Sequence, residues 1–320
     1  MNAFPDKPNA QPDETIEPRG EKADAREGST EGETEGSPAL PAVVPFAAEI
    51  AAPDPRLAAE FRAGPDAGFT ASILEAPRDP AWTAFDVLRL VFLALVALFV
   101  GMFAVLFAAH FSIPHHPSIL SLARVPLIVV AGQVVAYLLV LAYMYVLVTR
   151  ERRRPDFFAA IHWNWPKNMA PYLIGGATLS IALQLLAHLL PMPRNLPIDT
   201  FFTTPAEAWA LTIFGITLAP LMEELFFRGF LYPVLARGLG ITAATFITAF
   251  AFALLHGGQL KFSWGPVLVI FLVGTVLTMV RAYKNSVAAA LLVHIAYNGT
   301  LSVLMFVGTD GFRHLEKLNQ

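Results

Sequence analysis

The sequence predicts an all-α fold: a polytopic membrane helical bundle of about seven to eight transmembrane helices, with a disordered acidic N-terminal tail. Two observations predict it. The chain of 320 residues is 55 percent hydrophobic and only 15 percent charged, which is too apolar for a water-soluble domain of this size. Its apolar residues also gather in seven runs, each near the roughly 20 residues that a helix needs to cross the hydrocarbon core.

The first 80 residues differ from the rest of the chain in charge. They hold sixteen of the 25 acidic residues and seven of the 22 basic residues. A segment rich in Pro, Gly, Glu and Ala cannot bury a core, so we predict that residues 1–80 form a disordered cytosolic tail. Residues 81–310 then form the transmembrane bundle, and residues 311–320 form a short polar C-terminal tail.

Each apolar run predicts one membrane helix. The runs lie at residues 84–111, 125–149, 170–190, 205–237, 241–257, 265–281 and 286–308. The fourth and fifth runs meet at a turn near Gly238 to Gly240, which predicts that these two helices are antiparallel. Gly175, Gly176 and Gly274 lie inside runs, where we expect them to allow close contact between helices.

Basic residues in the short connections predict the orientation in the membrane. Two connections contain them, one after the second run and one after the sixth: Arg150, Arg152, Arg153, Arg154, Lys167, Arg281 and Lys284. Because basic connections stay in the cytoplasm, we expect the N-terminus to be cytoplasmic and the C-terminus to be outside. The membrane expected for such a chain is a bacterial inner (plasma) membrane.

Two adjacent carboxylates, Glu223 and Glu224, lie well inside the fourth run, whereas every other acidic residue after residue 80 lies at the end of a run or between runs. A charged group inside a membrane helix is costly and usually marks a functional site. Glu224 and Arg228 are four residues apart on one helical face, which predicts an ion pair. Glu223 points about 100° away and lacks that partner, so it is the candidate general base. The alternative is that both carboxylates pair with arginines and only fix helix packing.

Two further runs carry polar residues one helical turn apart. Phe252 and His256 lie in the fifth run, and His294 and Asn298 lie in the seventh. Each pair alone has an ordinary structural explanation, because a histidine near a helix end is often interfacial and polar side chains often tie membrane helices together. Their depths, however, coincide with that of Glu223.

The depths follow from the rise of an α-helix. Glu223 lies 17 residues before Gly240 and His256 lies 16 after it. Both are therefore about 25 Å along antiparallel helices at 1.5 Å per residue. From a start near Ser286, His294 and Asn298 lie about 12 and 18 Å into the seventh helix, and helix tilt can make up the difference. We therefore expect all four polar residues to meet in one buried cavity.

Three motifs in this order resemble a known family. Glu223-Glu224-x-x-x-Arg228, Phe252-x-x-x-His256 and His294-x-x-x-Asn298 are similar to the motifs of the CPBP family, which comprises CAAX proteases and bacteriocin-processing or self-immunity enzymes and is also called Abi. The similarity covers about residues 170–308, a protease-like core, and is nearest to the type II CAAX prenyl endopeptidases.

The resemblance implies an intramembrane endopeptidase that hydrolyses a peptide bond near or within the membrane. Carried over by position, it implies that Glu223 and His256 activate water and that His294 and Asn298 stabilise the oxyanion. Glu224, Arg228 and Phe252 would support them. The implied partners are a peptide or protein substrate, lipidated or not, and membrane lipids; no nucleic acid is expected.

Two questions stay open at the level of the sequence. The chain has no cysteine, so a metal would need His, Asp, Glu or Asn ligands, and Glu223, His256 and His294 are equally able to hold a zinc ion. The same polar residues also suit a non-catalytic membrane scaffold or bacteriocin immunity-type protein, or a proton-coupled transporter. The sequence lacks the signatures of other classes of intramembrane protease, which are His-Glu-x-x-His, Gly-x-Ser-Gly and Gly-x-Gly-Asp.

Overall fold

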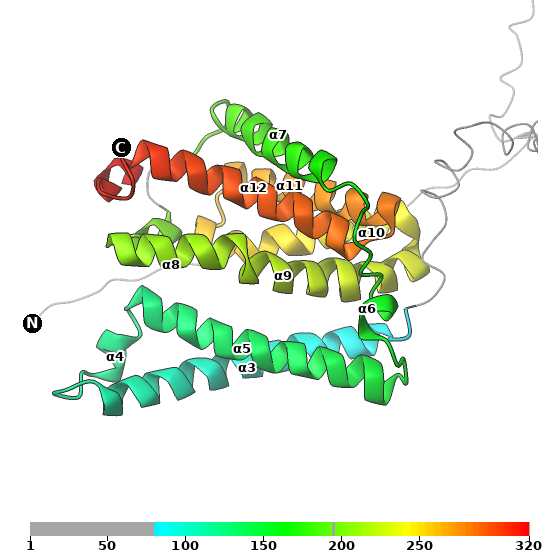
Figure 1. The fold of residues 1–320 in the computed structure, drawn as a ribbon, viewed down its shortest axis with the longest axis horizontal. Helices are drawn as coiled ribbons and strands as arrows, with labels where there is room; N and C mark the ends of the chain where they lie inside the picture. Colours follow the sequence, from blue (N-terminus) through cyan, green and yellow to red (C-terminus); the bar gives the residue numbers. More distant parts are fainter. Residues whose placement is uncertain (1–79, 194–195, 320) are drawn as a thin grey trace, which may run out of the picture. The chain divides into compact units, whose positions relative to one another are not determined.

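The computed structural model describes residues 80–193 and 196–319, and these residues form helices and turns without a β-strand (Figure 1). The all-α prediction is therefore confirmed for the described part of the chain. The predicted tail of residues 1–80 lies outside the described residues, apart from Pro80.

The helices follow the apolar runs closely. In chain order they are α3 (Ala84–Ser112), α4 (Ile119–Leu122), α5 (Pro126–Val146), η1 (Leu147–Glu151), α6 (Phe157–Ala160), α7 (Ala170–Ala187), η2 (Pro197–Phe201), α8 (Pro205–Ile216), α9 (Leu218–Glu224), η3 (Leu225–Leu231), α10 (Tyr232–His256), η4 (Gly257–Leu260), α11 (Trp264–Lys284), α12 (Val287–Gly308) and η5 (Leu315–Asn319). The elements η1 and η3 are π-helical, and η2, η4 and η5 are 3₁₀ helices.

Six helical stretches among the described residues are long and apolar enough to cross a membrane, and the fourth of them, Pro205–Leu260, is 56 residues long. This stretch contains both the fourth and the fifth predicted runs. Gly240 interrupts it with φ +78° and ψ 167°, outside the helical region. The chain reverses there, because 33 residues of straight helix would separate Glu223 from His256 by about 50 Å, whereas their side chains are 3.6 Å apart. The two predicted antiparallel helices are therefore present.

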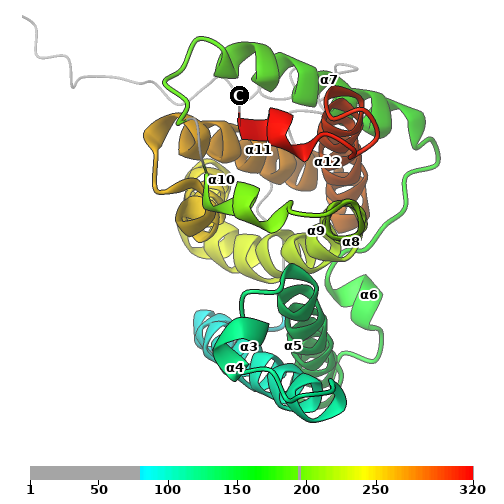
Figure 2. The same cartoon turned by 90° about the vertical axis from the view of Figure 1, so that its left-hand side faces the viewer.

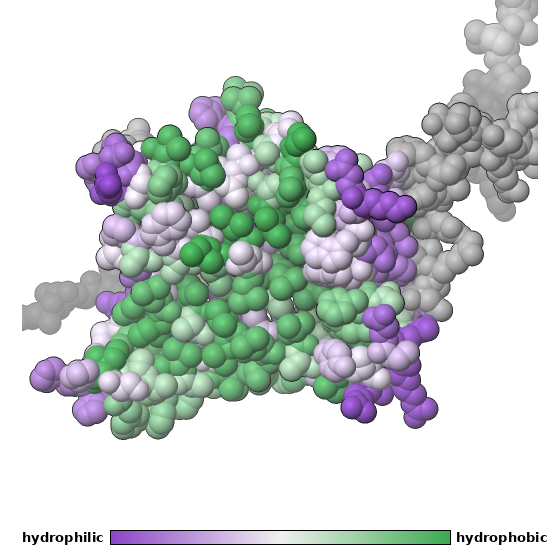
Figure 3. Space-filling model, in the orientation of Figure 1, coloured by the Kyte–Doolittle hydropathy of each residue, from purple (hydrophilic) through white to green (hydrophobic). Residues whose placement is uncertain are grey.

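The connections that the sequence assigns to one side of the membrane meet at one end of the bundle. Val287 donates its backbone N–H to the His162 carbonyl over 3.0 Å, and Asn164 Nδ2 donates to the Asn285 carbonyl over 3.1 Å. These bonds join the connection after α5 to the turn between α11 and α12. Figure 3 shows an apolar band between two more hydrophilic ends.

Small residues set the closest helix contacts. A Cβ atom at Gly176 in α7 would lie 2.3 Å from the Val293 carbonyl oxygen of α12, and one at Gly274 in α11 would lie 3.1 Å from Ala249 Cα of α10. Both glycines therefore have the packing role that we predicted. Gly175 does not, because nothing lies within 4 Å of its Cβ position. Figure 2 shows α7 beside α11 and α12, on the side of them away from the α3–α5 pair.

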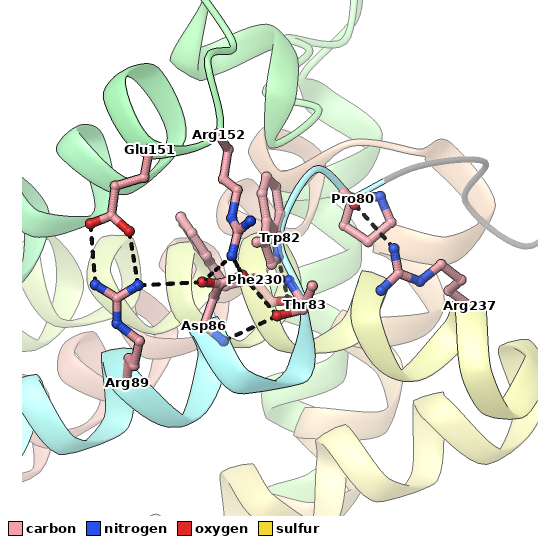
Figure 4. Close-up of polar contacts among 9 residues, drawn as sticks. All are labelled: Pro80, Trp82, Thr83, Asp86, Arg89, Glu151, Arg152, Phe230 and Arg237. Carbon is pink, nitrogen blue, oxygen red and sulfur yellow. Dashed lines mark hydrogen bonds and ion pairs between the residues drawn. The ribbon is translucent and has the colours of Figure 1, made fainter.

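The start of α3 is held by a buried carboxylate (Figure 4). Asp86 is fully buried, accepts the Thr83 backbone N–H over 2.8 Å and forms an ion pair with Arg152, just after η1. Beside it, Trp82 Nε1 donates to the Phe230 carbonyl of η3 over 3.0 Å. These contacts join α3 to the end of α5 and to the π-helix that follows Glu224.

We predict that Asp86→Ala lowers the free energy of unfolding by about 1–3 kcal/mol, because it removes a helix-capping group and leaves Arg152 without its carboxylate. Thermal unfolding of the purified protein in detergent measures the change. The matched control is Glu151→Gln, which breaks the half-exposed 2.8 Å pair with Arg89 and should cost less than about 1 kcal/mol. Equal losses in the two variants would contradict the prediction.

Candidate active site

The site is built around the junction between α9 and η3. Glu223 and Glu224 end α9, and Arg228 lies in the π-helical turn that follows. Arg228 Nη1 donates to Glu224 Oε1 over 2.8 Å, and both side chains are fully buried. The ion pair expected from their four-residue spacing is therefore present. A π-helical segment inside a longer helix is frequent at functional sites, because it redirects side chains and carbonyl groups.

Groups on two other helices hold the Arg228 guanidinium. Its Nη2 donates to the Gly274 carbonyl over 2.9 Å and its Nε donates to Thr278 Oγ1 over 3.3 Å, both on α11. Its Cζ lies 4.7 Å from the centre of the Phe252 ring on α10, within cation–π range. The sequence analysis missed Thr278 as a partner, since one threonine in an apolar run carries no distinguishing signal.

Arg281 corrects the sequence analysis, which placed it in a cytoplasmic connection. It lies inside α11 and is fully buried. Its Nε donates to the Arg228 carbonyl over 3.1 Å and its Nη1 donates to Asn285 Oδ1 over 2.7 Å. The physical reason is the π-helix, whose altered bonding pattern lets the Arg228 carbonyl accept from a side chain. Arg281 thus holds the backbone of the π-helical turn that carries Arg228.

The unpaired glutamate faces two imidazoles from two other helices. Glu223 Oε1 lies 3.6 Å from His256 Nε2 on α10, and Glu223 Oε2 lies 3.7 Å from His294 Nε2 on α12. The side chain of Glu223 keeps 16 percent of its surface exposed, whereas that of Glu224 keeps none. The coincident depths predicted from helix geometry are therefore found, and only the first carboxylate is accessible.

Hydrogen bonds at the other ring nitrogen fix the tautomer of each histidine. His294 Nδ1 lies 2.8 Å from Glu224 Oε1, and His256 Nδ1 lies 2.8 Å from the Phe252 carbonyl. Both partner oxygens only accept hydrogen bonds, so Nδ1 carries the proton in each ring. When neutral, each imidazole therefore presents an Nε2 lone pair toward Glu223. This arrangement can hold a water molecule and receive a proton from it.

Asn298 lies one turn after His294 and lines the same cavity. Its Nδ2 donates to the Gly215 carbonyl of α8 over 2.7 Å. Gly215 lies just before Thr217, where φ −112° and ψ −81° interrupt the helix between α8 and α9. One of the two N–H groups of the Asn298 amide is thereby engaged, which leaves one for a ligand.

Phe252 is a packing residue of the site. Its ring is 4.7 Å from the His256 ring, 5.8 Å from the His294 ring and 5.2 Å from the Phe227 ring, centre to centre. It also lies against the Arg228 guanidinium, so one ring contacts that buried cation and both imidazoles. The structure brings all seven residues singled out in the sequence together.

A cavity of about 710 Å³ opens from these polar groups. Glu223, His256, His294 and Asn298 form one part of its wall. Most of the remainder is apolar and comes from α5, α8, α11 and α12 and from the η2 and η4 segments. A volume and lining of this kind are typical of a ligand pocket.

The zinc alternative was tested against this geometry. No group of three His, Asp or Glu side chains within residues 80–193 and 196–319 is arranged to hold a metal ion. The three proposed ligands do not fit a metal centre as they lie, and the steps proposed below therefore use protein side chains alone.

We predict that Arg228→Met lowers the free energy of unfolding by about 3–5 kcal/mol, because it leaves the Glu224 carboxylate buried without its cation. Thermal unfolding in detergent measures this loss. The double variant Glu224→Gln/Arg228→Met removes both charges and should recover part of it. If the double variant is less stable than the single one, the ion pair does not have the role described here.

Comparison with known proteins identifies one family. Residues 205–300 match the family described as type II CAAX prenyl endopeptidase Rce1-like. The matched segment runs from the start of α8 into α12 and contains every residue of the three motifs. Searches of curated proteins and of solved structures found no match.

Proposed function

We propose that this chain is an intramembrane endopeptidase whose general base is Glu223, a proposal supported by the match of residues 205–300 to the type II CAAX prenyl endopeptidase Rce1-like family. One observation carries the proposal: a partly exposed carboxylate faces two imidazole nitrogens at 3.6 and 3.7 Å on the wall of a largely apolar cavity. A buried base with nearby proton acceptors is the arrangement that water activation requires.

In the proposed reaction, Glu223 takes a proton from a water molecule as the hydroxide oxygen adds to the scissile carbonyl carbon. The carbonyl π electrons move to its oxygen. The proton then passes to the nitrogen of the leaving amine as the C–N bond breaks. His256 and His294 support this step, because the Nε2 lone pair of each faces Glu223 and can receive the proton on its way.

Glu224 and Arg228 have a supporting role in this proposal. Glu224 accepts from His294 Nδ1, which orients the ring and stabilises the imidazolium that forms when Nε2 receives a proton. In that protonated state His294 can donate to the oxyanion, together with the remaining N–H of Asn298. The neutral state of His294 lacks this donor.

The cavity wall supports an apolar substrate segment. Phe201, Phe202 and Leu211 line one part of it, and Leu301 and Met305 line another. We propose a peptide or protein substrate that reaches the site within or beside the membrane. An attached lipid chain fits the same walls, so lipidated and unlipidated substrates both belong in the first assay.

We predict that Glu223→Gln lowers kcat/KM at least about 100-fold in cleavage of lipidated and unlipidated peptide pools, because it removes the general base without changing side-chain size. His294→Ala should also lose activity. Purified protein in liposomes is assayed by mass spectrometry of the products, with chelator and with added zinc. Loss of wild-type cleavage in chelator would contradict the metal-independent steps.

Glu207→Gln is the matched control for this assay. Glu207 lies in the first turn of α8 and accepts from Thr204 Oγ1 over 2.9 Å, away from the cavity. This variant should keep a rate close to that of the wild type. If the wild type and Glu223→Gln give equal product over the whole pool, the protease proposal is wrong.

The predicted orientation can be tested because the sequence has no cysteine. Arg153 and Lys261 are exposed residues at opposite ends of the bundle. We propose a cytoplasmic N-terminus, and therefore expect a membrane-impermeant thiol reagent to label Lys261→Cys in intact cells and Arg153→Cys only after permeabilisation. Labelling of Arg153→Cys alone in intact cells would reverse the orientation.

A further inference from the structure

In the proposed reaction the oxyanion forms while Glu223 holds the water proton and before His294 is protonated, and at that point the motif residues supply few hydrogen-bond donors. A tetrahedral oxyanion is usually held by two or more preorganised donors. His256 and His294 present lone pairs when neutral, and Asn298 has one N–H engaged by the Gly215 carbonyl. While both histidines are neutral, one uncommitted N–H, that of Asn298, is therefore available among the four motif residues that line the cavity.

A further donor lines the same cavity, on a helix outside the matched residues 205–300. Tyr137 of α5 lines the same cavity as Glu223, His294 and Asn298. The phenol and the proposed base therefore belong to the wall of one cavity.

Two contacts fix the Tyr137 side chain. Its ring stacks on Phe214, with centroids 5.8 Å apart and planes 13° apart. Its hydroxyl oxygen accepts a hydrogen bond from Gln133 Nε2 over 3.0 Å, one turn earlier on α5. Because that bond occupies an oxygen lone pair, the hydroxyl proton is left to donate. No acceptor for it is found among the described residues.

The remaining wall favours a neutral donor at this position. None of the described residues that line the cavity is a lysine or an arginine. A phenol supplies a hydrogen bond without the cost of burying another charge, and a donor in such a water-poor site acts more strongly than in water. Phe214 also immediately precedes Gly215, so the ring that positions Tyr137 is next to the carbonyl that holds Asn298.

We infer that Tyr137 is an oxyanion donor for the hydrolysis, positioned by Gln133 and Phe214. Its O–H hydrogen-bonds the carbonyl oxygen of the scissile peptide as that oxygen gains the π electrons, and the phenol keeps its proton throughout. The inference rests on the proposed function, since it assigns a further residue to the same reaction.

The test is Tyr137→Phe, which keeps the ring and its stacking on Phe214. A lost oxyanion donor should lower kcat by about 100-fold or more and leave KM nearly unchanged. Binding of a phosphinate analogue of a cleaved peptide, which carries the tetrahedral oxygens, should weaken by the same factor as kcat/KM. Gln133→Leu leaves the hydroxyl in place but frees it to rotate, so a loss of about tenfold or less is expected.

The matched control is Tyr145→Phe, because Tyr145 is an exposed tyrosine on the same helix. The Tyr145→Phe variant should change neither kcat nor KM. If Tyr137→Phe keeps the wild-type kcat, or raises KM alone, Tyr137 is not an oxyanion donor although Glu223→Gln is still inactive. If Glu223→Gln cleaves as well as the wild type, the proposed function itself fails.

Discussion

The buried ion pair between Glu224 and Arg228 is the interaction on which the rest of the site depends. Either charge alone would be strongly unfavourable at this depth, and removing one partner leaves the other uncompensated. The pair is also a meeting point of helices, because Arg228 bonds to Gly274 and Thr278 on α11 and Glu224 bonds to His294 on α12. One guanidinium and one carboxylate therefore fix the relative register of the helices that carry the site.

Two neighbouring residues of the same type acquire different properties from this environment. Glu224 is fully buried, and its Oε1 bonds both a guanidinium and an imidazole, whereas Glu223 is partly exposed to the cavity and faces two imidazole nitrogens. Carboxylates in one active site commonly divide their roles in this way, according to surroundings and not to residue type. A second buried guanidinium, that of Arg281, bonds the Arg228 carbonyl and so supports the turn that carries the ion pair.

Much of the fold and the motif residues could be predicted because both depend on local patterns. Apolar runs long enough to cross a membrane predicted the helices. Nearly equal distances from Gly240 predicted that Glu223 and His256 lie at one depth. Arg281 was misplaced, because a basic residue near the end of an apolar run looks like a connection residue until the π-helix and its accepting carbonyl are known. Thr278, Gln133 and Tyr137 were missed for a related reason: their importance comes from the groups that tertiary packing brings beside them, and neither spacing nor composition records those groups.

The reversal at Gly240 also limits how this part of the chain can change in length. The two arms that it joins have nearly equal lengths, 17 and 16 residues, between the turn and the groups they carry. One inserted or deleted residue in either arm would shift its group by about 1.5 Å along the helix and rotate it by about 100°, turning Glu223 or His256 away from its partner. Matched changes in both arms would move the site in depth but would still rotate both groups. The spacing between the two motifs is therefore under a stricter geometric constraint than the identity of the apolar residues between them.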